Sequence, residues 1–132
     1  SEYSKLNNLG FRLLHKGQVN SAKKYLERAI EIRPSVLPLG NMAHLLALEN
    51  KLQESKAYID VAKEYISNNC ERAFIEHCQF CIAISADNKN EALPHLREAL
   101  RLDNKTIVLY YQMNSNIAEW KQDTDILSIF AG

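Results

Sequence analysis

Residues 6–34 read LNNLGFRLLHKGQVNSAKKYLERAIEIRP, and the same skeleton returns 33 residues later along the chain. The recurring positions are apolar or small, and in the first copy they are Leu6, Leu9, Gly10, Leu13, Ala22, Leu26, Ala29 and Pro34. In the second copy they are Leu39, Met42, Ala43, Leu46, Ser55, Ile59, Ala62 and Ser67. A fixed period of this size is typical of stacked supersecondary units, so it predicts a repeat architecture before any other feature is considered.

Each repeat unit predicts a pair of helices. Apolar residues recur at helical spacing over residues 3–16 and again over residues 19–32. Gly17 lies between them, where a glycine favours a tight turn because it can adopt a positive φ without a Cβ clash. Gly10 and Ala22 are small, which lets the two helix axes approach closely. The unit is therefore predicted to be a helical hairpin.

This skeleton resembles the tetratricopeptide repeat family, whose pattern runs from a large residue through Leu-Gly to two spaced alanines and a proline. The first unit matches the pattern throughout, whereas the second has Ser55 at an alanine position and Ser67 at the proline. The resemblance implies an all-α fold, a right-handed α-α superhelix of about three helical hairpins plus a C-terminal capping helix. We expect one domain over residues 1–132, with repeats at about 3–34, 36–67 and 71–104, a capping helix at about 105–120 and a short apolar tail at 124–130.

The third repeat departs from the period. Ala62 and Ala99 are 37 residues apart, which is four more than the period of 33. We expect the extra residues in the loop at 68–70, with residues 85–88 as the alternative place.

Composition bounds the class of protein. The chain has 16 basic and 16 acidic residues, and this balance argues against a nucleic-acid partner. No apolar run approaches the ~18 residues that a membrane span needs, so we expect no membrane insertion. Three cysteines in a helical domain favour a reducing compartment, which predicts a cytoplasmic protein. The start at Ser1 rather than a methionine leaves open that the chain is a fragment of a longer protein.

One cluster suggests metal or thiol chemistry, namely His77, Cys78 and Cys81. Imidazole and thiolate are the ligands that zinc prefers, but a closed structural site needs four of them, and no second pair lies at ligand spacing. Cysteine also packs well between helices as a small hydrophobe. We therefore expect neither a metal nor a cofactor. Because the chain contains no glycine-rich phosphate loop and no HExxH, we also predict that it is not an enzyme.

The resemblance also implies a place for a partner. In the tetratricopeptide repeat family, the first helix of each hairpin lines a concave groove. Carried onto this chain, the groove-facing positions are Asn7, Phe11, Leu14, His15, Leu37, Asn41, His44, Leu48, Phe74, His77 and Tyr111. The set is nearly uncharged, which suits an extended or helical peptide with apolar anchors. For each residue taken singly, burial against neighbouring helices is an equally good interpretation.

Some members of the family grip a C-terminal carboxylate with a clamp of Lys, Arg and Asn. Of the corresponding positions here only Asn41 agrees, and no cation is available to pair with a carboxylate. We therefore predict a non-enzymatic scaffold that binds a peptide or helix of a partner protein without such a clamp. The alternatives are a homodimer that uses the groove and the apolar tail, and a metal or redox site at His77, Cys78 and Cys81.

Overall fold

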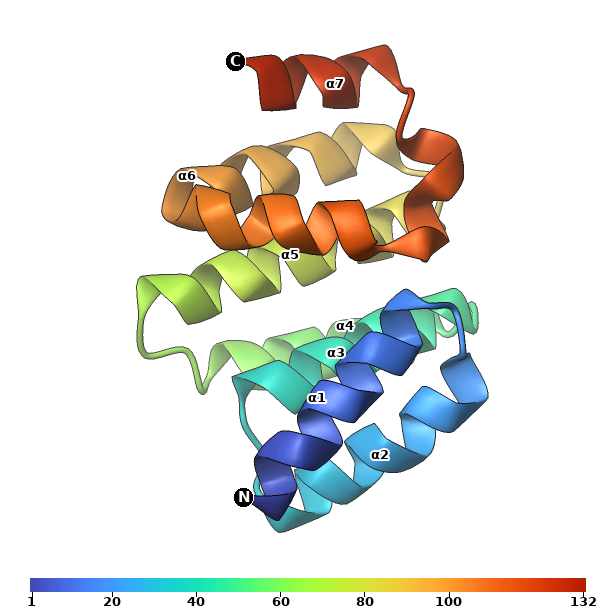
Figure 1. The fold of residues 1–132 in the computed structure, drawn as a ribbon, viewed down its shortest axis with the longest axis vertical. Helices are drawn as coiled ribbons and strands as arrows, with labels where there is room; N and C mark the ends of the chain where they lie inside the picture. Colours follow the sequence, from blue (N-terminus) through green and yellow to red (C-terminus); the bar gives the residue numbers. More distant parts are fainter.

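The computed structural model describes residues 1–132, and every regular element in it is a helix. The elements are α1 (Glu2–His15), α2 (Val19–Ile32), α3 (Val36–Leu48), α4 (Leu52–Lys63), α5 (Asn69–Ser85), α6 (Lys89–Met113), the 3₁₀ helix η1 (Ser115–Trp120) and α7 (Thr124–Ala131). The all-α prediction is confirmed. The hairpins stack along the long axis of the molecule, and the two termini lie at opposite ends (Figure 1).

The turn inside each hairpin has the same geometry. Gly17, Asn50 and Asp87 adopt positive φ values of 81°, 62° and 57°. At each turn the amide of the next residue donates to a carbonyl five positions back, as Gln18 does to Leu13 at 2.9 Å. This is the Schellman arrangement, which satisfies carbonyls that the helix end would otherwise leave free. Only the first of these turns was predicted from the sequence, where a glycine marks it, because the later two turns have Asn and Asp at the position of positive φ.

Close packing inside the first hairpin depends on Gly10. A Cβ at this position would meet Cγ and Cδ2 of Leu26 at 2.7 Å, and Leu26 is fully buried. In the second hairpin, Ser55 replaces the small alanine of the repeat pattern. Its hydroxyl donates to the carbonyl of Ala43 at 2.6 Å, so this buried polar group has a partner.

The extra residues of the third repeat lie in neither loop that the sequence suggested. Ser35 and Asn68 are the N-caps of α3 and α5 and are one period apart. The helices differ in length, however: α3 has 13 residues and α5 has 17. The four additional residues therefore form one more helical turn of α5, which nearly preserves the direction of the side chains that follow because an α-helical turn takes 3.6 residues.

The capping helix also differs from the prediction of one helix over 105–120. Asp103 has non-helical dihedrals and divides α6 into a first segment and a second segment, and the chain reverses direction between them (Figure 1). The second segment ends at Met113, and residues 115–120 form η1 instead of continuing the helix. The side chain of Asn114 accepts a hydrogen bond from the amide of Asn116 and so begins η1.

The apolar tail forms α7 and packs on its own chain. Ile126 is fully buried, and the ring of Phe130 lies 4.4 Å from that of Tyr111 in α6. Lys89 pairs with Asp123 at 3.1 Å and with Asp125 at 2.8 Å at the start of α7. No helix in the structure has both the length and the apolar character that crossing a lipid bilayer requires.

Candidate functional site

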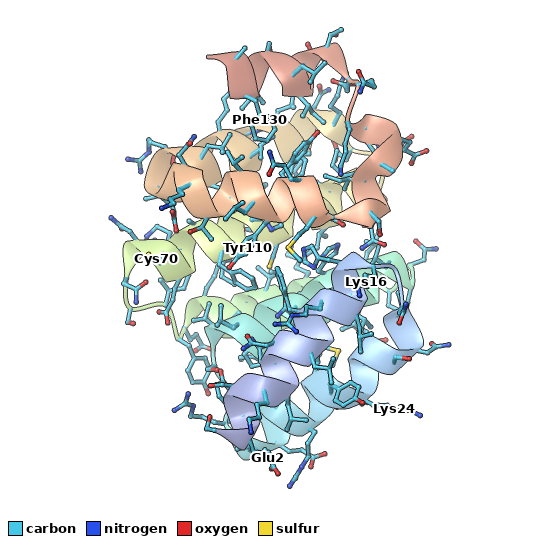
Figure 2. All side chains as sticks on the ribbon, viewed as in Figure 1. Glu2, Lys16, Lys24, Cys70, Tyr110 and Phe130 are labelled. Carbon is cyan, nitrogen blue, oxygen red and sulfur yellow. The ribbon has the colours of Figure 1, made fainter.

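The first helices of the three hairpins and the second segment of α6 face one another, and we call this shared surface the inner face. Tyr110 lies near the middle of the molecule in Figure 2. Its ring centroid is 5.0 Å from that of Phe11, 5.5 Å from that of His77 and 6.2 Å from that of Phe74. Tyr110 therefore contacts both α1 and α5 and fills the centre of the space in which sequence reasoning placed a groove.

The segment after α6 closes the inner face at its other side. The hydroxyl of Ser115 donates to the carbonyl of His15 at 2.7 Å, and the side-chain Nδ2 of Asn116 donates to the carbonyl of Leu14 at 2.8 Å. Both carbonyls belong to the last turn of α1, where a helix runs short of intrahelical donors, and that of Leu14 also accepts from the backbone amide of Gly17 at 3.0 Å. The chain thus joins its first helix to its C-terminal part across about 100 residues.

Burial separates the predicted groove residues into two groups. Eight of them are less than a tenth exposed: Asn7, Leu14, His15, Asn41, His44, Phe74, His77 and Tyr111. Phe11 and Leu48 are partly exposed, and Leu37 is 37% exposed. The structure brings most of the set together, but as a packed interior rather than as an open groove.

Two of the predicted positions belong to other surfaces. Leu14 is fully buried in the core with Leu26, Met42 and Leu45. Tyr111 packs against Phe80 and the tail, and it is its neighbour Tyr110 that reaches the inner face. One residue along a helix is a rotation of about 100°, so the reversal at Asp103, which sets the register of this segment, exchanges the roles of the two tyrosines.

Three histidines meet at the inner face. The ring centroid of His15 is 5.6 Å from that of His44 and 6.2 Å from that of His77. Burial lowers the pKa of His15 to about 4 and that of His77 to about 3, and burial with the nearby rings of His15 and His77 holds the pKa of His44 well below 6.5. All three are therefore neutral at pH 7. His15 Nδ1 donates to the carbonyl of Phe11 at 3.1 Å, which leaves Nε2 as a buried acceptor without a partner.

The cysteines beside this cluster are poor metal ligands. Burial raises the pKa of both the Cys78 and Cys81 thiols, with the neighbouring Cys81 raising that of Cys78 further. Cys81 Sγ lies 3.7 Å from His77 Nε2, so the two do share a helical face. No group of three or more His, Cys, Asp or Glu side chains is arranged to hold a metal ion. The Asn41 amide, the one position that agreed with the carboxylate clamp, donates to Asn7 Oδ1 at 3.2 Å.

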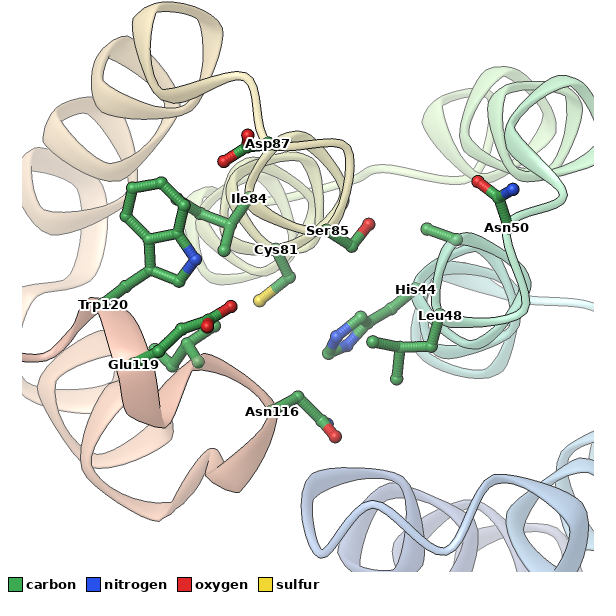
Figure 3. Close-up of a pocket in the computed structure, with 12 residues that line it drawn as sticks. His44, Leu48, Asn50, Cys81, Ile84, Ser85, Asp87, Asn116, Glu119 and Trp120 are labelled. Carbon is green, nitrogen blue, oxygen red and sulfur yellow. The ribbon is translucent and has the colours of Figure 1, made fainter.

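Two openings remain at the ends of the inner face. The first, which we call the apolar cleft, has a volume of about 340 Å³ and is lined by Leu37, Phe74, Ile107 and Tyr110 among others. It lies at the N-terminal ends of α3 and α5. The second, which we call the helix-end pocket, has a volume of about 580 Å³ and lies at the C-terminal ends of the same helices. His44, Cys81, Asn116, Glu119 and Trp120 surround it (Figure 3).

Sequence reasoning missed the residues that close the inner face, namely Tyr110, Asn114, Ser115 and Asn116. Their only visible signal is the polar run at 114–116, which interrupts the apolar spacing of the expected capping helix. That run predicts a helix end, but it does not indicate which distant carbonyls the polar side chains bind.

Comparison with known proteins bears on the first hairpin. Residues 4–37 match the family model of the tetratricopeptide repeat. No curated protein and no solved structure matched the chain. The match confirms, over that stretch, the resemblance inferred from the first unit. Repeats of this family generally form modules for protein–protein interaction.

Proposed function

Because residues 4–37 form a tetratricopeptide repeat, we propose that this chain is a non-enzymatic interaction module that binds a peptide or helix of a partner protein. The binding site is the apolar cleft, at the open end of the inner face. The single observation that carries this assignment is the exposure of Leu37 beside Phe74 and Tyr110, which forms an apolar depression at the surface.

Leu37 lies in the first turn of α3, where its side chain is 37% exposed. Phe74 forms the wall of the cleft on α5 and is only 4% exposed, while Ile107 and Tyr110 come from the second segment of α6. Aromatic side chains supply large apolar area at low entropic cost, which favours an apolar anchor of the partner at this place. Complete burial of one leucine or phenylalanine anchor contributes about 1.5–3 kcal/mol.

The middle of the inner face is the weaker candidate for direct contact. His15, His44 and His77 are each at most 2% exposed. A partner that entered from the apolar cleft and reached His77 would first have to displace Tyr110, whose ring packs against His77, Phe11 and Phe74. We therefore assign recognition to the end of the inner face and a structural role to its middle.

A selection experiment tests this function. Peptides from a random library are selected on the chain, and their affinities are measured by fluorescence anisotropy. Leu37→Asp should weaken the selected peptides by about tenfold or more, because a carboxylate would replace apolar contact area. Tyr65→Asp is the matched control, since Tyr65 is also an exposed apolar residue (46%) but does not line the cleft. Equal loss in both variants, or peptides that bind Leu37→Asp as well as the parent, would remove the assignment.

The other two interpretations have less support. For self-assembly, the tail would have to leave α6, on which Ile126 and Phe130 already pack. For metal or redox chemistry, the Cys78 and Cys81 thiols would have to ionise in a buried place that raises their pKa. All three cysteines are free thiols, which is the observation behind our proposal of a cytoplasmic location.

A further inference from the structure

We propose that the helix-end pocket binds a basic side chain, an arginine guanidinium above all, presented by a partner peptide. This site lies at the opposite ends of α3 and α5 from the apolar cleft. It rests on the proposed function only in that the cation belongs to a peptide, and the pocket can be probed without any partner.

The pocket carries unpaired negative charge. Asp87 and Glu119 line it, and neither carboxylate takes part in any ion pair of the structure. No lysine or arginine is among the residues that line the pocket. Lys89, two residues after Asp87, pairs with Asp123 and Asp125, and Lys121, two residues after Glu119, donates to the carbonyl of Gln112 at 3.0 Å. The charge of Asp87 and Glu119 is thus available to a ligand.

The backbone adds to the negative electrostatic potential of the pocket. Leu48 and Asn50 flank the C-terminal end of α3, and Ser85 and Asp87 flank that of α5, so both helices point their negative ends at the pocket. The aligned peptide dipoles of a helix give its C-terminus about half a negative charge, which favours a cation. Carboxylates and helix ends therefore act in the same direction.

A hydrogen-bond acceptor, the imidazole of His44, lies at the inner wall of the helix-end pocket. The ring of His44 points into the pocket toward Cys81 and Asn116 in Figure 3. This side chain is only 2% exposed, and no hydrogen bond of the structure involves its ring nitrogens. Because the ring is neutral, one nitrogen carries a lone pair that can accept an N–H from a guanidinium or an ammonium. His44 lines the pocket, so a ligand or water there can supply the partner that its ring lacks within the chain.

Trp120 indicates an organic cation rather than a metal ion. In the view of Figure 3 its indole lies to the left of the carboxylates of Asp87 and Glu119, at a height between theirs. A guanidinium stacks on an indole face and can also donate to carboxylates at its edge. The volume of about 580 Å³ falls within the range of sites for organic groups, about 300–1,000 Å³, and Ile84 and Ile117 provide apolar walls for an alkyl stem.

Trp120 is also the only tryptophan of the chain, so it reports on this pocket alone. N-acetyl-arginine amide is titrated into the full chain while the indole N–H resonance is followed by NMR. The matched ligand is N-acetyl-citrulline amide, which has the same shape without the charge. We expect a saturable shift with the arginine compound, and a shift at least fivefold smaller, at equal concentration, with the citrulline compound.

Variants test which groups bind. Asp87→Asn and Glu119→Gln should each weaken the arginine compound by about fivefold, the scale of a partly exposed charge-assisted hydrogen bond. Asn at 87 also keeps the preference for positive φ. Glu64→Gln removes an exposed carboxylate that does not line the pocket and should leave the titration unchanged.

Equal shifts from both compounds, no saturation, or equal weakening by Glu64→Gln would overturn the cation site. None of these results depends on the apolar cleft, because the probe has no apolar anchor. Conversely, loss of peptide binding in Leu37→Asp would leave the arginine titration intact. The two assignments can therefore fail separately.

Discussion

Acidification from pH 7.5 to pH 5 should strongly destabilise this protein, because its interior holds three neutral histidines. The folded-state pKa values of His15 and His77 are about 4 and about 3, and that of His44 lies well below 6.5. In the unfolded chain each histidine takes up its proton near pH 6.5. The unfolded state therefore binds protons first, and the stability that the neutral rings provide is complete above pH 6.5 and is lost as the pH falls toward the folded-state pKa values.

The size of the effect follows from these values. At pH 5 the lowered pKa values of His15 and His77 each cost about 2 kcal/mol of unfolding free energy, about 4 kcal/mol together, and the lowered pKa of His44 adds to this loss. A typical domain has only about 5–15 kcal/mol in total. The groups that face the rings do not oppose this trend, because the thiols of Cys78 and Cys81 and the phenol of Tyr110 have raised pKa values and stay neutral.

Urea unfolding followed by circular dichroism at pH 7.5, 6.5, 5.5 and 5.0 measures how the free energy of unfolding depends on pH. Staying at pH 5 and above limits the contribution of carboxylates with lowered pKa values, such as Glu98 and Asp123. His15→Gln should reduce the slope of stability against pH by about a third, since one of three titrating groups is gone. His95→Gln removes a histidine outside the cluster and is the control. A free energy of unfolding at pH 5 within about 1 kcal/mol of the value at pH 7.5 would refute the reasoning.

Two further predictions concern the turns and the closure of the inner face. Gly17→Ala should lower the unfolding free energy by about 1–2 kcal/mol, because a residue with a Cβ is strained at the φ of 81°. Steric clash is not the cause, since the new Cβ would make an ordinary contact with Asn116 at 3.4 Å. Asn50→Gly should not destabilise, since it relieves the same strain at φ 62°; thermal melts compare the two, and equal effects would contradict the turn argument. Asn116→Ala should cost about 1 kcal/mol through the lost bond to the carbonyl of Leu14. Hydrogen exchange at the end of α1 should rise in that variant, and unchanged exchange would show that this bond does not hold η1 against the end of α1.

The repeat architecture could be predicted because it depends on the local spacing of apolar and small residues. Apolar spacing specifies which side of each helix is buried, and small residues such as Gly10 and Ala22 mark close approach of two helices. These signals act over a few residues and recur with the period, so one chain alone suffices to find them. Leu37 and Phe74, which line the apolar cleft, were named from the groove positions that the family resemblance implies.

What tertiary structure alone decided is how the inner face is filled. The reversal at Asp103 directs Tyr110 rather than Tyr111 inward, and Asn116 reaches the carbonyl of Leu14 from 102 residues away. Such contacts depend on the summed rotations of several stacked hairpins, and a rotation of one residue on a helix changes which side chain arrives. No local spacing encodes that sum. The amino-acid sequence therefore determined the stack of helical hairpins, while packing at long range decided that the centre of the inner face is closed and that its two ends are open.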